Sequence, residues 1–274
     1  MDIIKFNKFS KNYGKVKAVD ELDFSIKKGN IVGFVGKNGA GKSTTLRCML
    51  NMINPTSGSI TINELDSVKD SKEIKKIVSY VPSDTCFYDN IKVIKLLSFT
   101  ATFYNTKMEE INKLCKYFEL DINKKINELS YGNKKKVALI IGLLKNSEIL
   151  IFDEPTNGLD PLMQKKFFDI ILKYKKKGKT IFLSSHNLVE IQNYCDEVAI
   201  IKDGKLVKYS SLNNIDINKQ VLYYETKDGI KKSIVIDNNI NSIIKELSLL
   251  DLVKLDIKTN SISDLFSKYY LEDK

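Results

Sequence analysis

A strand, a glycine-rich loop and a helix follow one another near the N-terminus, and this order constrains the chain most. Residues 31–35 are all apolar or glycine, and a helical pattern runs from about Ser43 to Asn51. Between them stands Gly36-Lys37-Asn38-Gly39-Ala40-Gly41-Lys42-Ser43, which fits the pattern G-x-x-x-x-G-K-[ST]. Its glycines let successive backbone N–H groups converge on phosphate oxygens, and the helix N-terminus adds partial positive charge. The segment therefore predicts a loop that binds the phosphates of a nucleoside triphosphate.

Individual positions of this loop have separate expected roles. Lys42 is predicted to reach the β- and γ-phosphates and to assist catalysis, and the Ser43 hydroxyl is predicted to ligate Mg²⁺. The alternative is a glycine-rich turn without a ligand, but the strand before it and the helix after it favour the phosphate loop. The residues expected to line the nucleotide are Gly36, Asn38, Gly39, Ala40, Gly41, Lys42, Ser43 and Thr44.

Two adjacent carboxylates predict the second half of the site. Asp153 and Glu154 directly follow the apolar run Ile149–Phe152. A buried strand that ends in acids places them at the edge where α/β sheets bind ligands. We expect Asp153 to hold Mg²⁺, directly or through water, and Glu154 to polarise the attacking water. Two adjacent acids usually lie in a solvated loop, but the strand and the phosphate loop favour the catalytic interpretation.

His186 is the single histidine of the chain. A lone histidine is more often structural than catalytic. This one follows the apolar residues 181–183 at the expected C-terminal end of a strand, where the γ-phosphate would lie. We therefore expect it to hold the γ-phosphate and the lytic water in geometry.

Apolar runs punctuated by glycine alternate with helical patterns, which is typical of an α/β fold. A helical insert is expected from Ile91 to about Asn127. Beyond Ser211 the pattern changes to a small α+β appendage of order ββαβα that closes with a helix at Ile262–Tyr270. Strands are expected at 3–6, 22–26, 31–35, 59–62, 77–81, 149–152, 180–184, 198–202, 206–209, 220–226, 232–236 and 252–257, with a further helix at 240–247.

Composition excludes some classes of protein. The longest apolar run, Val137–Leu144, is far shorter than the ~18–20 residues that span a bilayer. The N-terminus lacks the pattern of a signal peptide, so a cytoplasmic location is expected. Four scattered cysteines favour reduced thiols over a zinc site or a disulfide framework. The net charge of +10 suits nucleic acid or an anionic membrane, but the lysines are dispersed and equally suit solvated faces.

Five motifs in order resemble the nucleotide-binding subunit of ABC transporters. Leu129-Ser130-Tyr131-Gly132-Asn133 resembles the signature motif of that family, usually LSGGQ. The stretch from Glu154 to Asp160 resembles the segment from the catalytic glutamate through the D-loop. Tyr13 stands where the family has an aromatic residue that stacks on adenine, and His186 matches the switch histidine. The resemblance covers roughly residues 2–210.

This resemblance implies a fold, cofactors and a partner subunit. The fold is a P-loop NTPase core with an antiparallel β subdomain and a helical subdomain at about 88–147. The domains are then 1–213, which binds ATP and Mg²⁺, and 218–274, an accessory domain. Two such subunits dimerise head to tail, as a homodimer or heterodimer. Each ATP lies between the phosphate loop of one subunit and Ser130 and Gly132 of the other, with Asp160 nearby.

Two positions depart from the family pattern. Tyr131 replaces a glycine of the signature motif, while Ser130 and Gly132 remain. Ser83 stands where the Q-loop glutamine is usual, and Asp84 follows it. Either side chain could reach Mg²⁺ through water, but a serine is a poorer ligand than an amide oxygen. We therefore expect Ser83 near the metal, with unusual coupling through residues 81–91.

The family implies a separate membrane partner for this chain. It resembles exporter subunits that pair with a six-helix permease and handle antimicrobial or toxin peptides, lantibiotics or drugs. The expected location is the cytoplasmic face of the membrane, with contact made through the permease and no nucleic-acid partner. The alternatives are a soluble ABC ATPase acting on ribosomes or DNA, and a degenerate subunit without hydrolysis. Intact Lys42, Asp153, Glu154 and His186 argue against the last.

Overall fold

The computed structural model describes residues 1–214, 220–236 and 240–259, and the chain forms two compact units, 1–209 and 210–274. The domain limits predicted from the sequence, 1–213 and 218–274, stay a proposal. Within the described residues, no helix has both the length and the apolar character required to cross a bilayer.

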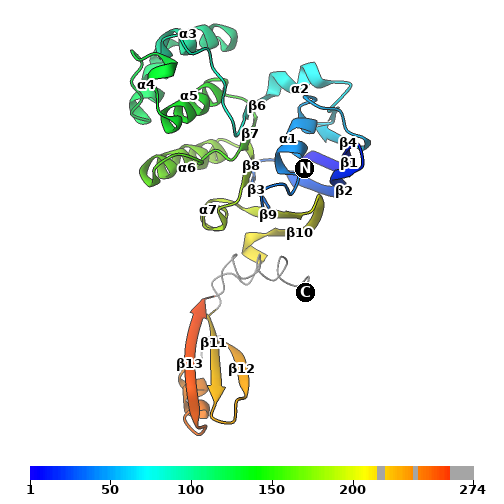
Figure 1. Cartoon of the computed structure of the whole chain (residues 1–274), viewed down its shortest axis with the longest axis vertical. Helices are drawn as coiled ribbons and strands as arrows, with labels where there is room; N and C mark the ends of the chain where they lie inside the picture. Colours follow the sequence, from blue (N-terminus) through cyan, green and yellow to red (C-terminus); the bar gives the residue numbers. More distant parts are fainter. Residues whose placement is uncertain (215–219, 237–239, 260–274) are drawn as a thin grey trace. The chain divides into compact units, whose positions relative to one another are not determined.

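A six-stranded sheet forms the centre of the first unit (Figure 1). Its order is β10-β9-β3-β8-β7-β6, and the pairs from β9 to β6 are parallel. Every residue of β3, β7 and β8 is buried, which explains why their sequences are mostly apolar. The strands are β3 Ile31–Val35, β6 Val78–Val81, β7 Ile149–Asp153, β8 Thr180–Ser185, β9 Glu197–Lys202 and β10 Lys205–Ser211.

An antiparallel sheet packs against this core. Its order is β2-β1-β4-β5, built from β1 Asp2–Tyr13, β2 Val16–Lys27, β4 Ser57–Ile62 and β5 Leu65–Asp66. Phe6 and Phe24 stack across β1 and β2 with ring centroids 4.4 Å apart. Phe6 also lies 6.3 Å from Phe182 of β8, which in turn contacts Phe34 of β3 at 5.3 Å. These aromatic contacts join the two sheets in one core.

Four helices accompany the sheets: α1 Lys42–Met49, α2 Ser71–Ile77, α6 Pro161–Lys176 and α7 Leu188–Tyr194. The strand predicted at 77–81 is wrong by one residue, because Ile77 ends α2 and β6 starts at Val78. The sequence interpretation names no helix between β7 and β8, where α6 lies. Asp160 caps α6 by accepting from Met163 N at 3.0 Å, and Pro161 starts it, which is a favourable N-terminal sequence.

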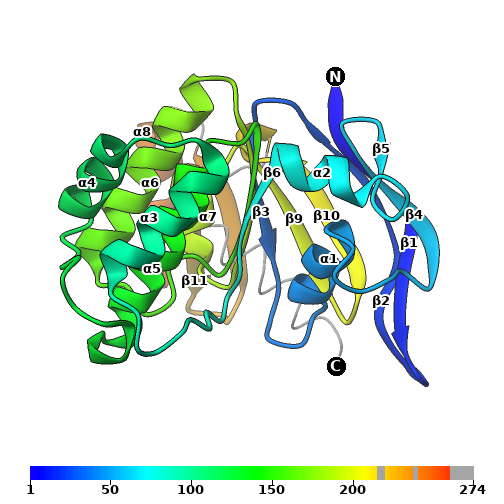
Figure 2. The same ribbon diagram turned by 90° about the horizontal axis from the view of Figure 1, so that it is seen from above.

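A helical group connects β6 to β7 and lies to one side of the sheets (Figure 2). It consists of α3 Val93–Tyr104, α4 Met108–Tyr117, the short 3₁₀ helix η1 Ile126–Glu128 and α5 Tyr131–Leu144. α5 docks on β6, where Ser79 Oγ donates to the carbonyl of Gly142 at 2.6 Å. The helical insert predicted from Ile91 to about Asn127 contains α3 and α4, and α5 follows it within the limits of about 88–147 predicted for the helical subdomain, which stay a proposal.

The second unit contains η2 Leu212–Asn214 and a three-stranded antiparallel sheet of order β12-β11-β13. Its elements are β11 Gln220–Thr226, β12 Lys231–Ile236, α8 Ile240–Leu247 and β13 Leu252–Thr259. These elements confirm the predicted order ββαβ. The closing helix predicted at Ile262–Tyr270 lies outside the described residues.

Candidate active site

The phosphate loop leaves β3 and enters α1 with its backbone closely packed. A Cβ on Gly36 would lie 2.5 Å from the carbonyl oxygen of Ile201, and a Cβ on Gly41 would lie 2.4 Å from that of Ala18. Gly41 also has φ +103°, a conformation that favours glycine. Any larger residue would push the loop off its neighbours. Gly36 and Gly41 are thus required by the fold itself.

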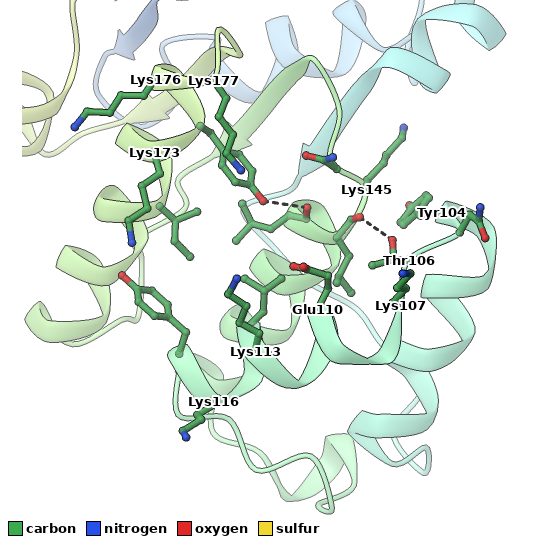
Figure 3. Close-up of a pocket in the computed structure, with 18 residues that line it drawn as sticks. Tyr104, Thr106, Lys107, Glu110, Lys113, Lys116, Lys145, Lys173, Lys176 and Lys177 are labelled. Atoms are coloured by element: carbon green, nitrogen blue, oxygen red, sulfur yellow. Dashed lines mark hydrogen bonds between the residues drawn. The ribbon is translucent and has the colours of Figure 1, made fainter.

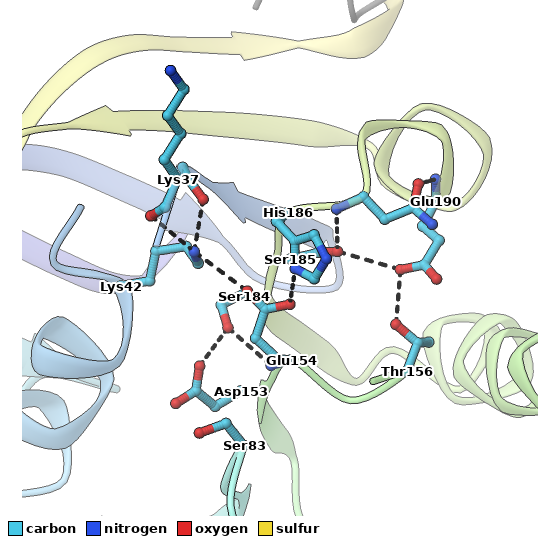
Figure 4. A network of polar contacts seen from close by, with 12 residues as sticks. Lys37, Lys42, Ser83, Asp153, Glu154, Thr156, Ser184, Ser185, His186 and Glu190 are labelled. Atoms are coloured by element: carbon cyan, nitrogen blue, oxygen red, sulfur yellow. Dashed lines mark hydrogen bonds and ion pairs between the residues drawn. The ribbon is translucent and has the colours of Figure 1, made fainter. Parts of the chain in front are cut away.

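Lys42, Glu154 and His186 meet at the C-terminal edge of the sheet (Figure 4). The buried ammonium of Lys42 donates to the carbonyl of Gly36 at 2.7 Å and lies 3.3 Å from Glu154 Oε1. His186 Nδ1 lies 2.9 Å from Glu154 Oε2. The Glu154 carboxylate is therefore held between a cation of the phosphate loop and the imidazole after β8. The structure brings together three side chains that lie far apart in sequence.

Ser184 joins the two carboxylate residues and was not singled out by sequence. Its hydroxyl donates to Asp153 Oδ1 at 2.6 Å and accepts from the Glu154 N–H at 3.0 Å. Glu154 has φ +46°, a left-handed conformation that costs a side-chain-bearing residue about 1–2 kcal/mol. Such strain concentrates at functional sites, where the surroundings hold it in place. Asp153 pairs with Ser184 across the parallel strands β7 and β8. Knowledge of this register would have identified Ser184 as a site residue.

Asp153 has the character of a metal ligand. Its side chain is fully buried, and its Oδ2 atom has no hydrogen-bond partner among the described residues. An unpartnered buried carboxylate oxygen is costly unless a cation accompanies it. Ser43 stands at the second residue of α1, and α1 packs against β7. Asp153 and Ser43 thus fit a hard cation such as Mg²⁺, which prefers oxygen ligands.

A second buried network fixes the segment that follows Glu154. Glu190 Oε2 accepts from Thr156 Oγ1 at 3.0 Å and from Ser185 Oγ at 3.3 Å. Burial raises the pKa of Glu190, and the nearby Glu154 carboxylate raises it further. The network connects the segment after β7 to the end of β8 and to α7. It therefore fixes the segments that carry Glu154 and His186 relative to one another.

The signature segment begins α5 and touches the segment after Glu154. Ser130 is the N-cap of α5, and its Oγ accepts from Asn133 N at 3.4 Å. A Cβ on Gly132 would lie 2.5 Å from the carbonyl oxygen of Gly158. The Tyr131 ring lies over Gly158, where an added Cβ would approach it to 2.4 Å. Tyr131 therefore packs within its own subunit and remains half-exposed.

Tyr13 and Ser83 lie at different depths. Tyr13 ends β1 with a half-exposed ring, and the Lys11 ammonium lies 5.2 Å from its centroid.

Ser83 follows β6 beside Asp153 (Figure 4). Lys135 connects Ser83 to Asp153 by donating to the main-chain carbonyls of both. It is a buried residue that the sequence does not single out within its run of three lysines. Burial lowers the pKa of Lys135 to about 8, and Asp153 is the largest of the charges that oppose this.

A separate cavity of about 1090 Å³ lies among α4, α6 and the ends of α3 and α5 (Figure 3). It contains none of the predicted site residues. Lysines line it together with a single acid, Glu110. Several of these lysines, including Lys145, Lys173 and Lys176, stand at the C-terminal ends of α5 and α6. Positive charges stabilise the negative C-terminal ends of helix dipoles, so these lysines have a structural role.

The geometry defines a P-loop nucleotide hydrolase with a carboxylate and a histidine opposite the phosphate loop. The family model described as "ABC transporter" matches residues 19–157. The chain is 36% identical to an uncharacterized ABC transporter ATP-binding protein of Methanocaldococcus jannaschii, over 96% of this chain and 97% of that protein. It is 33% identical to the bacitracin transport ATP-binding protein BcrA of Bacillus licheniformis, over 97% and 96%. The chain belongs to the ABC transporter family as an ATP-binding protein.

Solved structures agree with this assignment. A structure described as the ATP-binding subunit of an ABC transporter superposes with a TM-score of 0.71 at 27% identity, covering 78% of this chain and 91% of that one. A dimeric bacterial ABC transporter cassette superposes with a TM-score of 0.69 at 25% identity, covering 77% and 99%. The predicted ABC ATPase fold is confirmed. The chain carries the ATPase domain of this family.

Proposed function

We propose that Lys42, Asp153, Glu154 and His186 form one half of a composite site, in which ATP hydrolysis drives export through a separate permease. The observation that carries this proposal is the position of the Glu154 carboxylate. It lies between Lys42 of the phosphate loop and His186 after β8, with Asp153 directly before it.

The residues of this half-site act mainly by position and charge. Lys42 neutralises the β- and γ-phosphates, and the backbone N–H groups around Gly36, Gly39 and Gly41 hold their oxygens. Glu154 orients the attacking water and accepts its proton. His186 fixes the Glu154 carboxylate through Nδ1 and holds the γ-phosphate. In this proposal Tyr13 stacks on adenine.

When Mg²⁺ is bound, it neutralises part of the charge of the phosphates. Asp153 and Ser43 are proposed to hold it, and Ser83 is proposed to contribute beside them. The unpartnered Oδ2 of Asp153 supports this role. The Ser184 hydroxyl keeps Asp153 Oδ1 occupied, so Oδ2 is the oxygen that remains for the cation.

The other half of the site comes from a second subunit. Ser130 and Gly132 stand at the start of α5, a helix of 14 residues whose N-terminal N–H groups suit a phosphate oxygen. We propose that they bind the γ-phosphate of ATP held by the partner. Asp160 lies in the contact between the two subunits. The arrangement serves a homodimer or a heterodimer.

The transported cargo is proposed from the relatives. A protein that matches almost the whole chain is named for bacitracin transport, which supports a peptide antibiotic, a lantibiotic, a toxin peptide or a drug. The permease is proposed to be a separate six-helix protein, with this chain on the cytoplasmic face of the membrane. The test is resistance in a sensitive host that expresses the chain with its permease. Equal resistance from wild type and Glu154→Gln would contradict ATP-driven export.

The catalytic assignment has its own test. Glu154→Gln should retain ATP binding, because the amide keeps the shape of the side chain, while the rate of hydrolysis should fall by about 10²–10⁴-fold. The measurements are a nucleotide titration and phosphate release. Hydrolysis at the wild-type rate would show that Glu154 is not the residue that activates water.

A further inference from the structure

Lys135 makes an unusual set of contacts for a lysine. Its side chain is 1% exposed. Its ammonium donates to the carbonyls of Pro82 and Ser83, both at 3.0 Å, and to that of Asp153 at 3.5 Å. An ammonium has three N–H donors, so three backbone carbonyls satisfy it completely.

These acceptors belong to two segments that the proposed function places at the metal. Pro82 and Ser83 follow β6, at the position where the Q-loop glutamine is usual, and Asp153 ends β7. The donor belongs to α5, the helix that begins at Ser130. One side chain therefore connects the start of the signature helix to both segments.

The position of Lys135 along α5 suits such a connection. Gly142 lies seven residues later, on the same face of the helix, and its carbonyl accepts from Ser79 of β6. α5 is thus attached at Gly142 to β6 itself, and at Lys135 to the segment that follows the strand's C-terminal end. Ser130 lies only about 7.5 Å from Lys135 along the helix axis, given a rise of ~1.5 Å per residue.

We propose that Lys135 is a positioning residue that couples the two half-sites of one subunit. This inference rests on the proposed function. Through Lys135, the placement of Ser130 against a partner's ATP is linked to the placement of Ser83 and Asp153 at the subunit's own Mg²⁺. The connection is made to main-chain carbonyls, so it does not depend on the Ser83 side chain.

The test compares Lys135→Met with Lys145→Met in the full chain. Methionine matches the aliphatic part of the lysine side chain and removes the ammonium with all three donors. Lys145 is a matched control, because it caps the other end of α5 and its ammonium also donates to backbone carbonyls, those of Lys75 and Val78. It lies outside the proposed site.

Lys135→Met should raise the half-saturating Mg²⁺ concentration for hydrolysis by about ten- to hundredfold, the usual loss when a residue that orients a metal ligand is removed. The Hill coefficient for ATP should fall towards one, while the Kd for a fluorescent ATP analogue without Mg²⁺ stays within about threefold. Lys145→Met should lower Tm and leave the Mg²⁺ requirement and the Hill coefficient unchanged. Lys135→Arg keeps the charge and the donors, so it should recover part of the Mg²⁺ affinity and part of the Hill coefficient.

A purely structural role would lower Tm in both methionine variants and leave both kinetic quantities at wild-type values, which would overturn the proposal. A Lys135→Arg variant with no recovery, where Lys135→Met is folded, would also overturn it. Failure of the proposed function looks different. In that case the wild-type chain itself hydrolyses ATP without cooperativity or without a need for Mg²⁺.

Discussion

Ser184→Ala offers a quantitative test of the carboxylate arrangement. The Ser184 hydroxyl is fully buried and donates to Asp153 Oδ1 at 2.6 Å, so its removal takes a donor from a charged group. A hydrogen bond to a charged group contributes about 1.5–3 kcal/mol. The Glu154 N–H loses the hydroxyl but keeps the Ser184 carbonyl at 3.2 Å, so it adds little to this cost.

The expected effect appears in two measurements. At about 2–4 °C per kcal/mol for a domain of this size, Tm should fall by roughly 3–12 °C. Phosphate release should slow by about ten- to hundredfold, because the hydroxyl orients the residue proposed to hold Mg²⁺. Both are measured on the purified chain, by thermal unfolding without nucleotide and by steady-state hydrolysis.

Thr106→Ala is the matched control for this experiment. Its hydroxyl also donates across elements, but to the neutral carbonyl of Leu144 at 3.0 Å, remote from the carboxylates. It should cost about 0.5–1.5 kcal/mol of stability and leave hydrolysis unchanged. The reasoning is refuted if Ser184→Ala unfolds at the wild-type temperature, or if its hydrolysis rate matches that of Thr106→Ala.

Three further predictions concern the surroundings of the site. Gly158→Ala should lower Tm, because Gly158 has φ +76° and the new Cβ would meet the Tyr131 ring. Adding Tyr131→Gly should restore part of the lost Tm. Equal Tm values for the single and double variants would contradict this contact. The raised pKa of Glu190 means that its protonated form favours the folded state, so its contribution to stability is complete below its ordinary value of 4.5 and is lost as the pH rises through the folded value. Glu190→Gln should therefore increase Tm at neutral pH, with a gain that shrinks as the pH approaches 4.5; a gain independent of pH would show that the buried charge of Glu190 is not its cause. Lys42→Ala should lose nucleotide binding in a titration, and an unchanged Kd would exclude the phosphate-loop assignment.

The parts of the site that sequence predicts are those fixed by short segments. A phosphate loop needs its glycines, Lys42 and Ser43 within eight residues, and Asp153 and Glu154 directly follow one apolar strand. The structure places both Lys42 and His186 in contact with Glu154, which the order along the chain only suggests.

The parts that sequence misses depend on tertiary register. Ser184 becomes important only because β7 and β8 pair in parallel with Asp153 opposite it. Lys135 lies in the run Lys134-Lys135-Lys136, which resembles a solvated face until α5 docks on β6 and buries it. α6 is missed for a different reason, because Asp160 followed by Pro161 is a local signal for the start of a helix that the sequence interpretation does not use.

The central claim is that ATP completes its site between two subunits. The most direct measurement is the mass of Glu154→Gln in solution with saturating ATP and Mg²⁺, alone and combined with Ser130→Glu. Glu154→Gln should give a species of twice the chain mass. The double variant should stay a monomer, because Ser130→Glu adds negative charge where the partner's γ-phosphate would bind. A Glu154→Gln chain that binds ATP but stays monomeric, or a double variant that dimerises as well, would contradict it.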